Sequence, residues 1–332
     1  MGHSVKIGRI MFKKIPDISK QIYKEDIKKI LVNEYSLLGP IWVNFQMEWM
    51  NGIYTTFKNH DKYLIIIYLL KKTIDFYSRS FVQLSYEEFY QRDTVAIEKF
   101  NITEISNVLN IPKESARRKI NELKDLGIIK KTKKNVIIDR SCFSLVKPDN
   151  TIKRISRFLA ILSKLCVDEK ILSKKLTSGH LEIAIKDNFS YIWKIYYEMQ
   201  IPMLLGYKKI FKDLETFHIF CSCVVNQHTN TEKYYKKKMS RKFFLAAIIN
   251  EKIQGINAMS ISDITGIPRA TAIRKLQQLV KNQNLTIDKK KHYRLSGNFI
   301  HKLSPTQNTL LEQLANFSCQ IFNYSESLSK KT

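Results

Sequence analysis

One 23-residue segment occurs twice in this chain. Residues 101–123 and 257–279 align without a gap at an offset of 156 positions, and nine of the 23 pairs are identical. The identical pairs are Asn101/Asn257, Ile105/Ile261, Ser106/Ser262, Ile111/Ile267, Pro112/Pro268, Ala116/Ala272, Arg118/Arg274, Lys119/Lys275 and Leu123/Leu279. A repeat at a fixed offset constrains the fold more than a single motif does, because one backbone has to suit both copies. It indicates a structural unit duplicated within one polypeptide.

The repeated segment has the pattern of two short helices joined by a tight turn. Asn101 is a helix-capping residue type, and Glu104, three positions later, is its expected capping-box partner. Asn110 falls in the turn, where the second copy has Gly266, and both residue types tolerate a positive φ angle. The expected buried face of the first helix consists of Ile105, Val108 and Leu109.

Pro112 and Pro268 begin the second helix, where a missing N–H costs nothing. One side of this helix is apolar and is expected to be buried: Ala116, Ile120 and Leu123, or Ala272, Leu276 and Leu279. The opposite side is mostly basic and polar: Lys113, Ser115, Arg117, Arg118 and Asn121, or Arg269, Thr271, Ile273, Arg274 and Gln277. Arg and Lys can bond guanine edges or phosphates, and Asn and Gln can pair with adenine. Ile273 occupies the position of Arg117 in the second copy. It either touches a thymine methyl group or packs against other side chains of the protein.

A β-hairpin with a basic tip is expected after each second helix. In the first copy, residues 128–129 and 136–138 flank Lys130, Lys131, Lys133 and Lys134. In the second copy, residues 285–287 and 293–295, the latter including Arg294, flank Lys289, Lys290 and Lys291. Lysines at such a tip can reach phosphates or a minor groove. These basic residues complete the set of expected DNA contacts.

The two segments resemble the winged-helix domains of bacterial transcription regulators. The first copy has the pattern Ile-Ser-x-x-Leu-x-Ile-Pro-x-x-Ser-Ala-x-Arg at residues 105–118, followed by Leu-Gly-Ile-Ile at 126–129. The second copy has Ile-Ser-x-Ile-x-Gly-Ile-Pro-x-x-Thr-Ala-x-Arg at residues 261–274, and Asn282-Gln283 in place of Leu-Gly. Long helices around each unit look like the MarR-type arrangement, in which flanking helices form a dimerisation layer. The resemblance implies two winged helix-turn-helix units that bind DNA.

The charge of the chain is consistent with a polyanionic partner. The sequence has 56 Lys and Arg against 30 Asp and Glu, a formal net charge of +26. Such an excess is typical of nucleic-acid binding and less often of binding to an anionic membrane surface. A helix-turn-helix can also serve as a protein-interaction fold, and additional lysines can simply increase solubility.

Helical periodicity dominates the rest of the chain. Apolar helices are expected at about 22–38, 41–57, 64–77, 152–166, 181–200, 203–225, 242–252 and 305–324. Gly39-Pro40 separates the first two of these helices. Pro40 is expected to open the helix at 41–57, and Pro202 is expected to open the helix at 203–225. Residues 147–150 are the expected boundary between two halves, 1–148 with a winged helix at about 101–140 and 149–332 with one at about 257–296. The expected fold is mainly α, with two small β-hairpin wings, long packing helices and an internal duplication.

Other chemistry is poorly supported by the sequence. Five cysteines are too few for a disulfide framework, which favours a reduced, cytoplasmic protein. His218, Cys221, Cys223 and His228 could bind metal but lack a zinc-site spacing, so neither metal nor cofactor is expected. Without a phosphate loop or nucleophile elbow, an enzyme is not expected. No signal peptide is evident, and the apolar run 63–70 is too short to span a membrane.

Aromatic clusters at 42–49, 196–197 and 243–244 are expected to pack in the core or, alternatively, to line a small-molecule effector pocket.

The expected function is sequence-specific binding of double-stranded DNA by a transcription regulator. One chain acts as a pseudo-dimer, or two chains form a homodimer. The alternatives are a plasmid or phage replication initiator and a nucleoid-type protein with little sequence preference. Because the exposed positions of the second helices differ between copies, the two half-sites are expected to differ.

Overall fold

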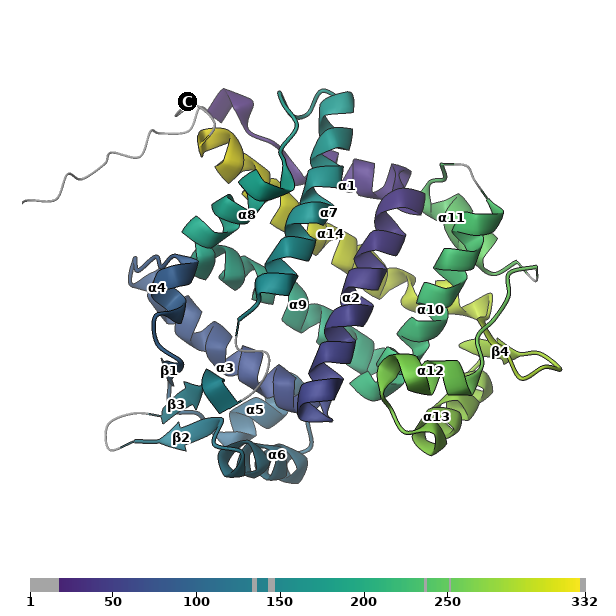
Figure 1. Cartoon of the computed structure of the whole chain (residues 1–332), viewed down its shortest axis with the longest axis horizontal. Helices are drawn as coiled ribbons and strands as arrows, with labels where there is room; N and C mark the ends of the chain where they lie inside the picture. The colour runs from purple at the N-terminus through teal and green to yellow at the C-terminus, as the bar shows by residue number, and fades with distance from the viewer. Residues whose placement is uncertain (1–17, 133–135, 143–146, 236–237, 251, 329–332) are drawn as a thin grey trace, which may run out of the picture.

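The computed structural model describes residues 18–132, 136–142, 147–235, 238–250 and 252–328, and is mainly helical with two small antiparallel sheets (Figure 1). The first half contains η1 (Ile18–Lys20), α1 (Lys24–Asn33), α2 (Tyr35–Phe57), α3 (His60–Arg79), α4 (Tyr86–Tyr90), β1 (Thr94–Ile97), α5 (Ile102–Leu109), α6 (Lys113–Asp125), β2 (Ile129–Lys131), β3 (Val136–Asp139) and η2 (Arg140–Cys142). The second half contains α7 (Asp149–Asp168), α8 (Ser178–Asp187), α9 (Phe189–Phe211), α10 (Leu214–Tyr234), α11 (Arg241–Ile248), α12 (Ala258–Thr265), α13 (Arg269–Lys281), β4 (Leu285–Ile287), β5 (Tyr293–Leu295) and α14 (Asn298–Leu328).

Corresponding helices have similar lengths in the two halves. Helices α1 and α8 both have 10 residues, and α2 and α9 both have 23. Helix α3 has 20 residues and α10 has 21, whereas α5 and α12 have eight each and α6 and α13 have 13 each. The similarity in element order therefore begins well before the repeated 23-residue segment.

The long helices of the two halves interleave. Helix α2 packs against α10, α3 packs against α9, and α14 packs against α1 and α9. In Figure 1, α2, α7 and α10 lie in front, and α14 runs obliquely behind them. One continuous apolar core includes Trp42 and Leu64 from the first half and Phe217 and Leu314 from the second. The sequence-predicted boundary at 147–150 coincides with the start of α7, yet core packing crosses it.

Three prolines of the described residues lie inside helices, contrary to the sequence expectation; one of them is Pro305, because α14 begins at Asn298 and not at 305. Pro40 is the sixth residue of α2, so Gly39-Pro40 does not separate two helices, and Pro202 lies in the second half of α9. A proline removes one backbone hydrogen bond and clashes with the preceding turn. Burial of large side chains such as Trp42 and Phe45 on α2 offsets that cost, at about 1.5–3 kcal/mol per apolar side chain. The helix break that the sequence placed at Pro202 falls instead at Asn188, between α8 and α9.

The first sheet contains a strand that the hydrophobic pattern did not predict. Strand order is β1-β3-β2, and β1 pairs antiparallel with β3 so that Val95 lies opposite Ile138. The second sheet has only β4 and β5, but an isolated bridge joins Ile256 to Tyr293 at the position that β1 occupies in the first. In both units, one strand of the hairpin thus pairs with the segment that directly precedes the two short helices.

Candidate nucleic-acid interface

The two repeated segments have closely similar local geometry. Asn101 Oδ1 accepts a hydrogen bond of 2.7 Å from Thr103 N, and Asn257 Oδ1 accepts one of 2.9 Å from Ser260 N. In the turn, Asn110 has φ 49° and Gly266 has φ 68°, both left-handed. The Ser106 hydroxyl donates to Ile111 O, and the Ser262 hydroxyl donates to Ile267 O, each at 2.7 Å. These serines fix the two turns through the same bond.

Half of the expected capping box is present, and Glu104 also contacts α3. The Asn101 side chain caps through Thr103 N, not through Glu104 N. The Glu104 carboxylate accepts a hydrogen bond from the backbone N–H of Asn101, as a capping box requires, and also hydrogen bonds from the Tyr68 hydroxyl at 2.7 Å and from Lys72 Nζ at 2.8 Å. These hydrogen bonds, first of all that from Lys72, hold the pKa of the Glu104 carboxyl below its ordinary value. Glu104 therefore fastens α5 to α3, a contact between distant residues that sequence spacing does not reveal.

Val108 was expected on the buried face of the first helix, but it is 44% exposed. Its counterpart Ile264 is 47% exposed. Because α5 and α12 have only eight residues each, Ile105 and Leu109 suffice to cover the contact of α5 with α6, and the neighbouring residue faces outward. Both copies thus present an apolar side chain at the same surface position.

The second helix of each pair buries the predicted apolar side and exposes the predicted polar side. Ala116, Ile120 and Leu123 of α6 are buried, as are Ala272, Leu276 and Leu279 of α13. Exposed positions are Lys113, Arg117, Arg118, Asn121, Arg269, Arg274 and Gln277. Half-buried positions are Ser115, Thr271 and Ile273. Arg117 lies 3.3 Å from Glu114, and Arg118 lies 3.7 Å from Glu122; both are solvent-exposed pairs that hold the arginines weakly.

Lys119 and Lys275 belong to the scaffold of these helices. Both side chains are buried. Lys275 Nζ lies 2.8 Å from an Asp213 oxygen and 3.3 Å from Glu215, at the start of α10. Lys119 Nζ lies 3.7 Å from Asp61, at the start of α3. Each lysine anchors a second helix to the N-terminus of a long packing helix.

The first hairpin has two exposed lysines among its described residues, and Lys130 is paired with a carboxylate. Lys130 Nζ donates to Asp139 Oδ2 at 2.7 Å across the strand pair. This contact raises the pKa of Lys130 and, together with hydrogen bonds from Ser141, lowers the pKa of Asp139 to about 2. Lys131 is exposed. Lys133 and Lys134, the predicted tip contacts, lie outside the described residues.

The second hairpin has its lysines at the tip, as the sequence predicted. Asp288 Oδ1 accepts from Lys290 N and His292 N, each at 2.9 Å, and this closes the turn. Lys291 has φ 58°, and Lys289, Lys290 and Lys291 are exposed, whereas Arg294 on β5 is half-buried. The tip therefore carries three adjacent cations.

The departure at Asn282-Gln283 leaves the backbone unchanged. Gln283 has φ 57°, close to the 72° of Gly127 at the matching position. Gly127 N donates to Lys124 O at 2.8 Å, and Gln283 N donates to Val280 O at 2.9 Å. Both second helices thus end in the same way and lead into their hairpins with the same geometry.

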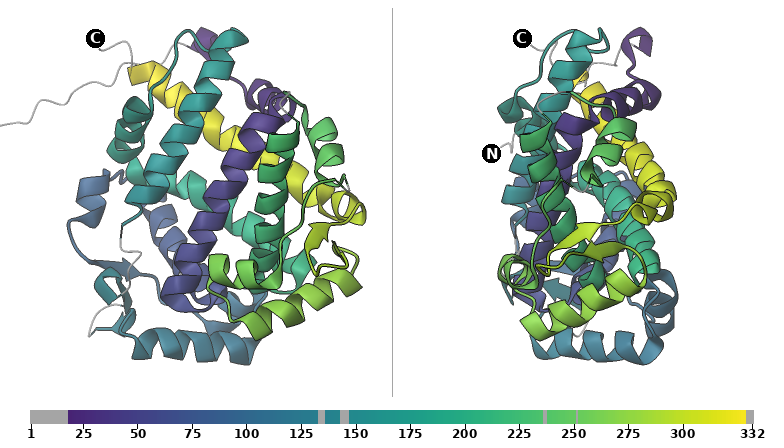
Figure 2. Two further views of the ribbon diagram at one scale, coloured as in Figure 1. Left: turned by 45° about the vertical axis from the view of Figure 1, so that its right-hand side comes forward. Right: turned by 90° about the vertical axis from the view of Figure 1, so that its right-hand side faces the viewer.

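The two units lie on one edge of the molecule. In the three views of Figures 1 and 2, α6 and α13 both run along the lower edge, below the long helices. Between them, the N-terminal regions of α3 and α10 meet, and the rings of His60 and His218 are 5.0 Å apart. Lys208 of α9 bonds Asp61 at 2.9 Å and Leu109 O at 3.3 Å, so the second half also holds the first helix pair.

The His and Cys residues of α10 are engaged in the core. His218 Nε2 lies 2.8 Å from Asn51 Oδ1, and burial lowers the pKa of His218 and of His228 to about 3. Burial raises the pKa of the Cys221 thiol to about 12 and that of Cys223 still further. Among the residues that the structure describes, no three His, Cys, Asp or Glu side chains are grouped as metal ligands. Within the same ranges, every helix is too short or too polar to cross a membrane.

Comparisons with protein-family models, with curated proteins and with solved structures find no significant match to this chain.

Proposed function

We propose that this chain binds double-stranded DNA in a sequence-dependent manner and acts as a transcription regulator. The observation that carries the proposal is the pair α6 and α13. Both helices bury the same positions and carry basic and polar side chains on their exposed sides, and both lie on one edge of the molecule. An α-helix fits the major groove, where such side chains can bond base edges. In this proposal α6 and α13 are the recognition helices of two winged helix-turn-helix units.

The two units are proposed to derive from an internal duplication and to take the place of the two subunits of a dimer. The similar lengths of five helix pairs, α1/α8, α2/α9, α3/α10, α5/α12 and α6/α13, and their shared order along the chain support this origin. Two-fold dimers of this motif read half-sites roughly 34 Å apart, in successive major grooves. A single chain can then contact both half-sites.

The hairpins are proposed to contact phosphates. Lys131 on the first hairpin and Lys289, Lys290 and Lys291 on the second are exposed, and the net charge of +26 favours a polyanion. Lys130 contributes less, because Asp139 already compensates its charge at 2.7 Å. Phosphate contacts orient the protein on DNA, whereas the recognition helices supply the sequence preference.

The half-sites are proposed to differ from each other. The exposed positions of α6 include Arg117, where α13 has the half-buried Ile273. An arginine can form two hydrogen bonds to guanine, whereas an isoleucine offers only apolar contact to a thymine methyl. The two helices therefore have different base preferences while sharing one scaffold.

A salt titration tests the proposal. Fluorescence anisotropy would measure binding of a duplex selected from random DNA and of a scrambled duplex of the same length and composition. We expect both affinities to fall with salt and the selected duplex to bind at least about 10³-fold more tightly. Equal affinities at every salt concentration would support a nucleoid-type protein instead. Failure of both duplexes to bind would reject DNA as the partner.

A further inference from the structure

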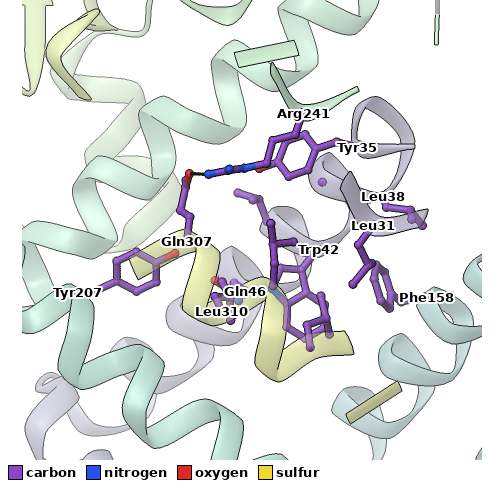
Figure 3. Close-up of a pocket in the computed structure, with 14 residues that line it drawn as sticks. Leu31, Tyr35, Leu38, Trp42, Gln46, Phe158, Tyr207, Arg241, Gln307 and Leu310 are labelled. Atoms are coloured by element: carbon purple, nitrogen blue, oxygen red, sulfur yellow. Dashed lines mark hydrogen bonds between the residues drawn. The ribbon is translucent and has the colours of Figure 1, made fainter. Parts of the chain in front are cut away.

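The similarity between the halves extends to the long helices and to the way in which they meet. Residues 35–58 align without a gap with residues 189–212, at an offset of 154 positions, and six of the 24 pairs are identical. Four residues of α2 and the four residues 154 positions later on α9, Gln46 and Gln200 among them, line one small cavity. Gln46 and Tyr207 also line the neighbouring cavity that Figure 3 shows. Helices α2 and α9 thus contact each other through equivalent positions, as two subunits do across a two-fold axis.

Equivalent bonds join the two halves near the edge that carries α6 and α13. The Tyr54 hydroxyl of α2 donates a hydrogen bond to the Glu215 carboxylate of α10. At the positions 154 residues apart from these, Lys208 Nζ of α9 donates to Asp61 Oδ1 of α3 at 2.9 Å. Asp61 and Glu215 also lie 3.7 and 3.3 Å from the buried lysines of α6 and α13. The α2–α3 and α9–α10 turns are therefore neighbours, and they lie between the two proposed recognition helices.

Each of these two turns carries an exposed lysine at the same position. Lys58 follows the last residue of α2 with φ 50°, and Lys212, its counterpart 154 positions later, follows the last residue of α9 with φ 72°. Among the described residues, neither lysine pairs with a carboxylate, and Lys58 Nζ lies 5.6 Å from the centre of the Tyr54 ring. The carboxylates at the starts of α3 and α10 are already engaged by buried lysines. The centre of this edge therefore offers two free cations to a polyanion.

We propose that Lys58 and Lys212 contact the minor groove of the DNA spacer between the two half-sites, with its flanking phosphates, and make the protein prefer an A·T-rich spacer. This inference rests on the proposed function. When two recognition helices enter successive major grooves on one side of a duplex, the minor groove between them faces the protein. A·T tracts narrow this groove and strengthen its negative potential, which attracts inserted cations. The spacer presents similar phosphates to both halves, and this explains why the two turns carry the same residue while exposed positions of α6 and α13 differ.

The first test varies only the spacer. Fluorescence anisotropy would measure binding of the full chain to three duplexes that share the selected half-sites and carry an A·T, a G·C or an inosine·cytosine spacer. Inosine·cytosine lacks the guanine amino group in the minor groove but keeps the major-groove edge of G·C. We expect the A·T and inosine·cytosine spacers to bind at least about fivefold more tightly than G·C, which is the smaller effect of one unfavourable base pair. Equal binding of all three, or tight binding of A·T alone, would overturn the proposal.

The second test removes the two lysines. The double variant Lys58→Met/Lys212→Met should lose the preference for the A·T spacer and reduce the salt slope by about two, while still preferring the selected half-sites to scrambled DNA. Lys164→Met/Lys170→Met is the matched control. Both of its lysines are exposed, Lys170 has φ 60°, and the C-terminal end of α7 that carries them lies far from the lower edge in Figure 1.

Two results would overturn this inference and leave the proposed function standing: equal effects of the two double variants, or a spacer preference that persists without Lys58 and Lys212. If the selected half-sites and scrambled DNA bind the wild type equally, the proposed function fails and this inference fails with it.

Discussion

At the scale of single residues, identity between the two copies marks the scaffold more than the proposed recognition surface. Lys119 and Lys275 are identical, yet both are buried and paired with carboxylates at the starts of α3 and α10. Arg117 and Ile273 differ, and they lie on the outer side of their helices. Comparison of the two copies could distinguish buried scaffold residues from exposed ones only where the residues are apolar. Whether a lysine is buried can be predicted only when the carboxylate that pairs with it is known.

Loss of the Lys275 ammonium should destabilise the protein. In Lys275→Met, the Asp213 and Glu215 carboxylates lose their cation at 2.8 and 3.3 Å. Because the Asp213 side chain is 46% exposed, we expect a loss of about 1–3 kcal/mol in unfolding free energy, less than for a fully buried pair. Urea denaturation measures it, with the exposed Lys281→Met as control. An unchanged urea midpoint would show that water stabilises the Asp213 and Glu215 carboxylates as well as the Lys275 ammonium does.

Arg117 and Lys131 should affect DNA binding in different ways. Arg117→Ala is expected to relax base preference at one position by about 1–3 kcal/mol, because it removes a contact to a base edge. Lys131→Ala is expected to weaken all duplexes about equally and to reduce the salt slope by about one. Anisotropy titrations against duplexes substituted at each position distinguish the two. A uniform loss for Arg117→Ala would assign that arginine to phosphate binding.

Buried histidines should make stability fall in weak acid. His228 lies edge-on to Phe244, and burial lowers its pKa to about 3. The unfolded chain binds a proton at the ordinary pKa of about 6.5, so stability is full above pH 6.5 and falls as the pH drops towards 3. Between pH 7.5 and 5, His228 should account for a loss of about 2 kcal/mol. In His228→Leu, urea denaturation at these two pH values should show a smaller pH effect by that amount. Equal pH effects in variant and wild type would contradict this assignment.

At the scale of elements, local signals predicted the repeated units well. Helix caps, the positive-φ turn and the buried alanine depend on neighbouring residues, and all lie where the pattern placed them. Other elements depend on distant partners. Strand β1 forms because β3 pairs with it, and Pro40 remains inside α2 because burial of the helix outweighs a lost hydrogen bond. Neither partner is visible in a local window of sequence.

The turn between the two helices sets a specific requirement at Gly266. Its φ is 68°, and an added Cβ would meet no atom within 4 Å. The cost of Gly266→Ala therefore comes from the left-handed backbone alone, about 1–2 kcal/mol. Gly266→Asn should cost less, because Asn110 already occupies the same turn at φ 49°. Urea denaturation of both variants checks this order. Equal stability of the Ala and Asn variants would contradict it.

At the scale of the whole molecule, the interleaving of the halves is the main departure from a simple tandem arrangement. The sequence places two units in order along the chain, but it does not show that α2 packs against α10 and α3 against α9. Such pairing depends on contacts between residues more than a hundred positions apart, which periodicity cannot supply. Its consequence is that α6 and α13 are carried on one shared core and lie on one edge.

We propose that one chain binds an asymmetric DNA site through two unlike recognition helices, α6 and α13. The most direct test is selection of bound fragments from random double-stranded DNA, followed by measurement of the protein-to-DNA ratio on the enriched sequence. We predict two different half-sites, about one helical turn apart, bound by a single chain. A strictly palindromic site, two chains per site, or no enrichment at all would contradict the account.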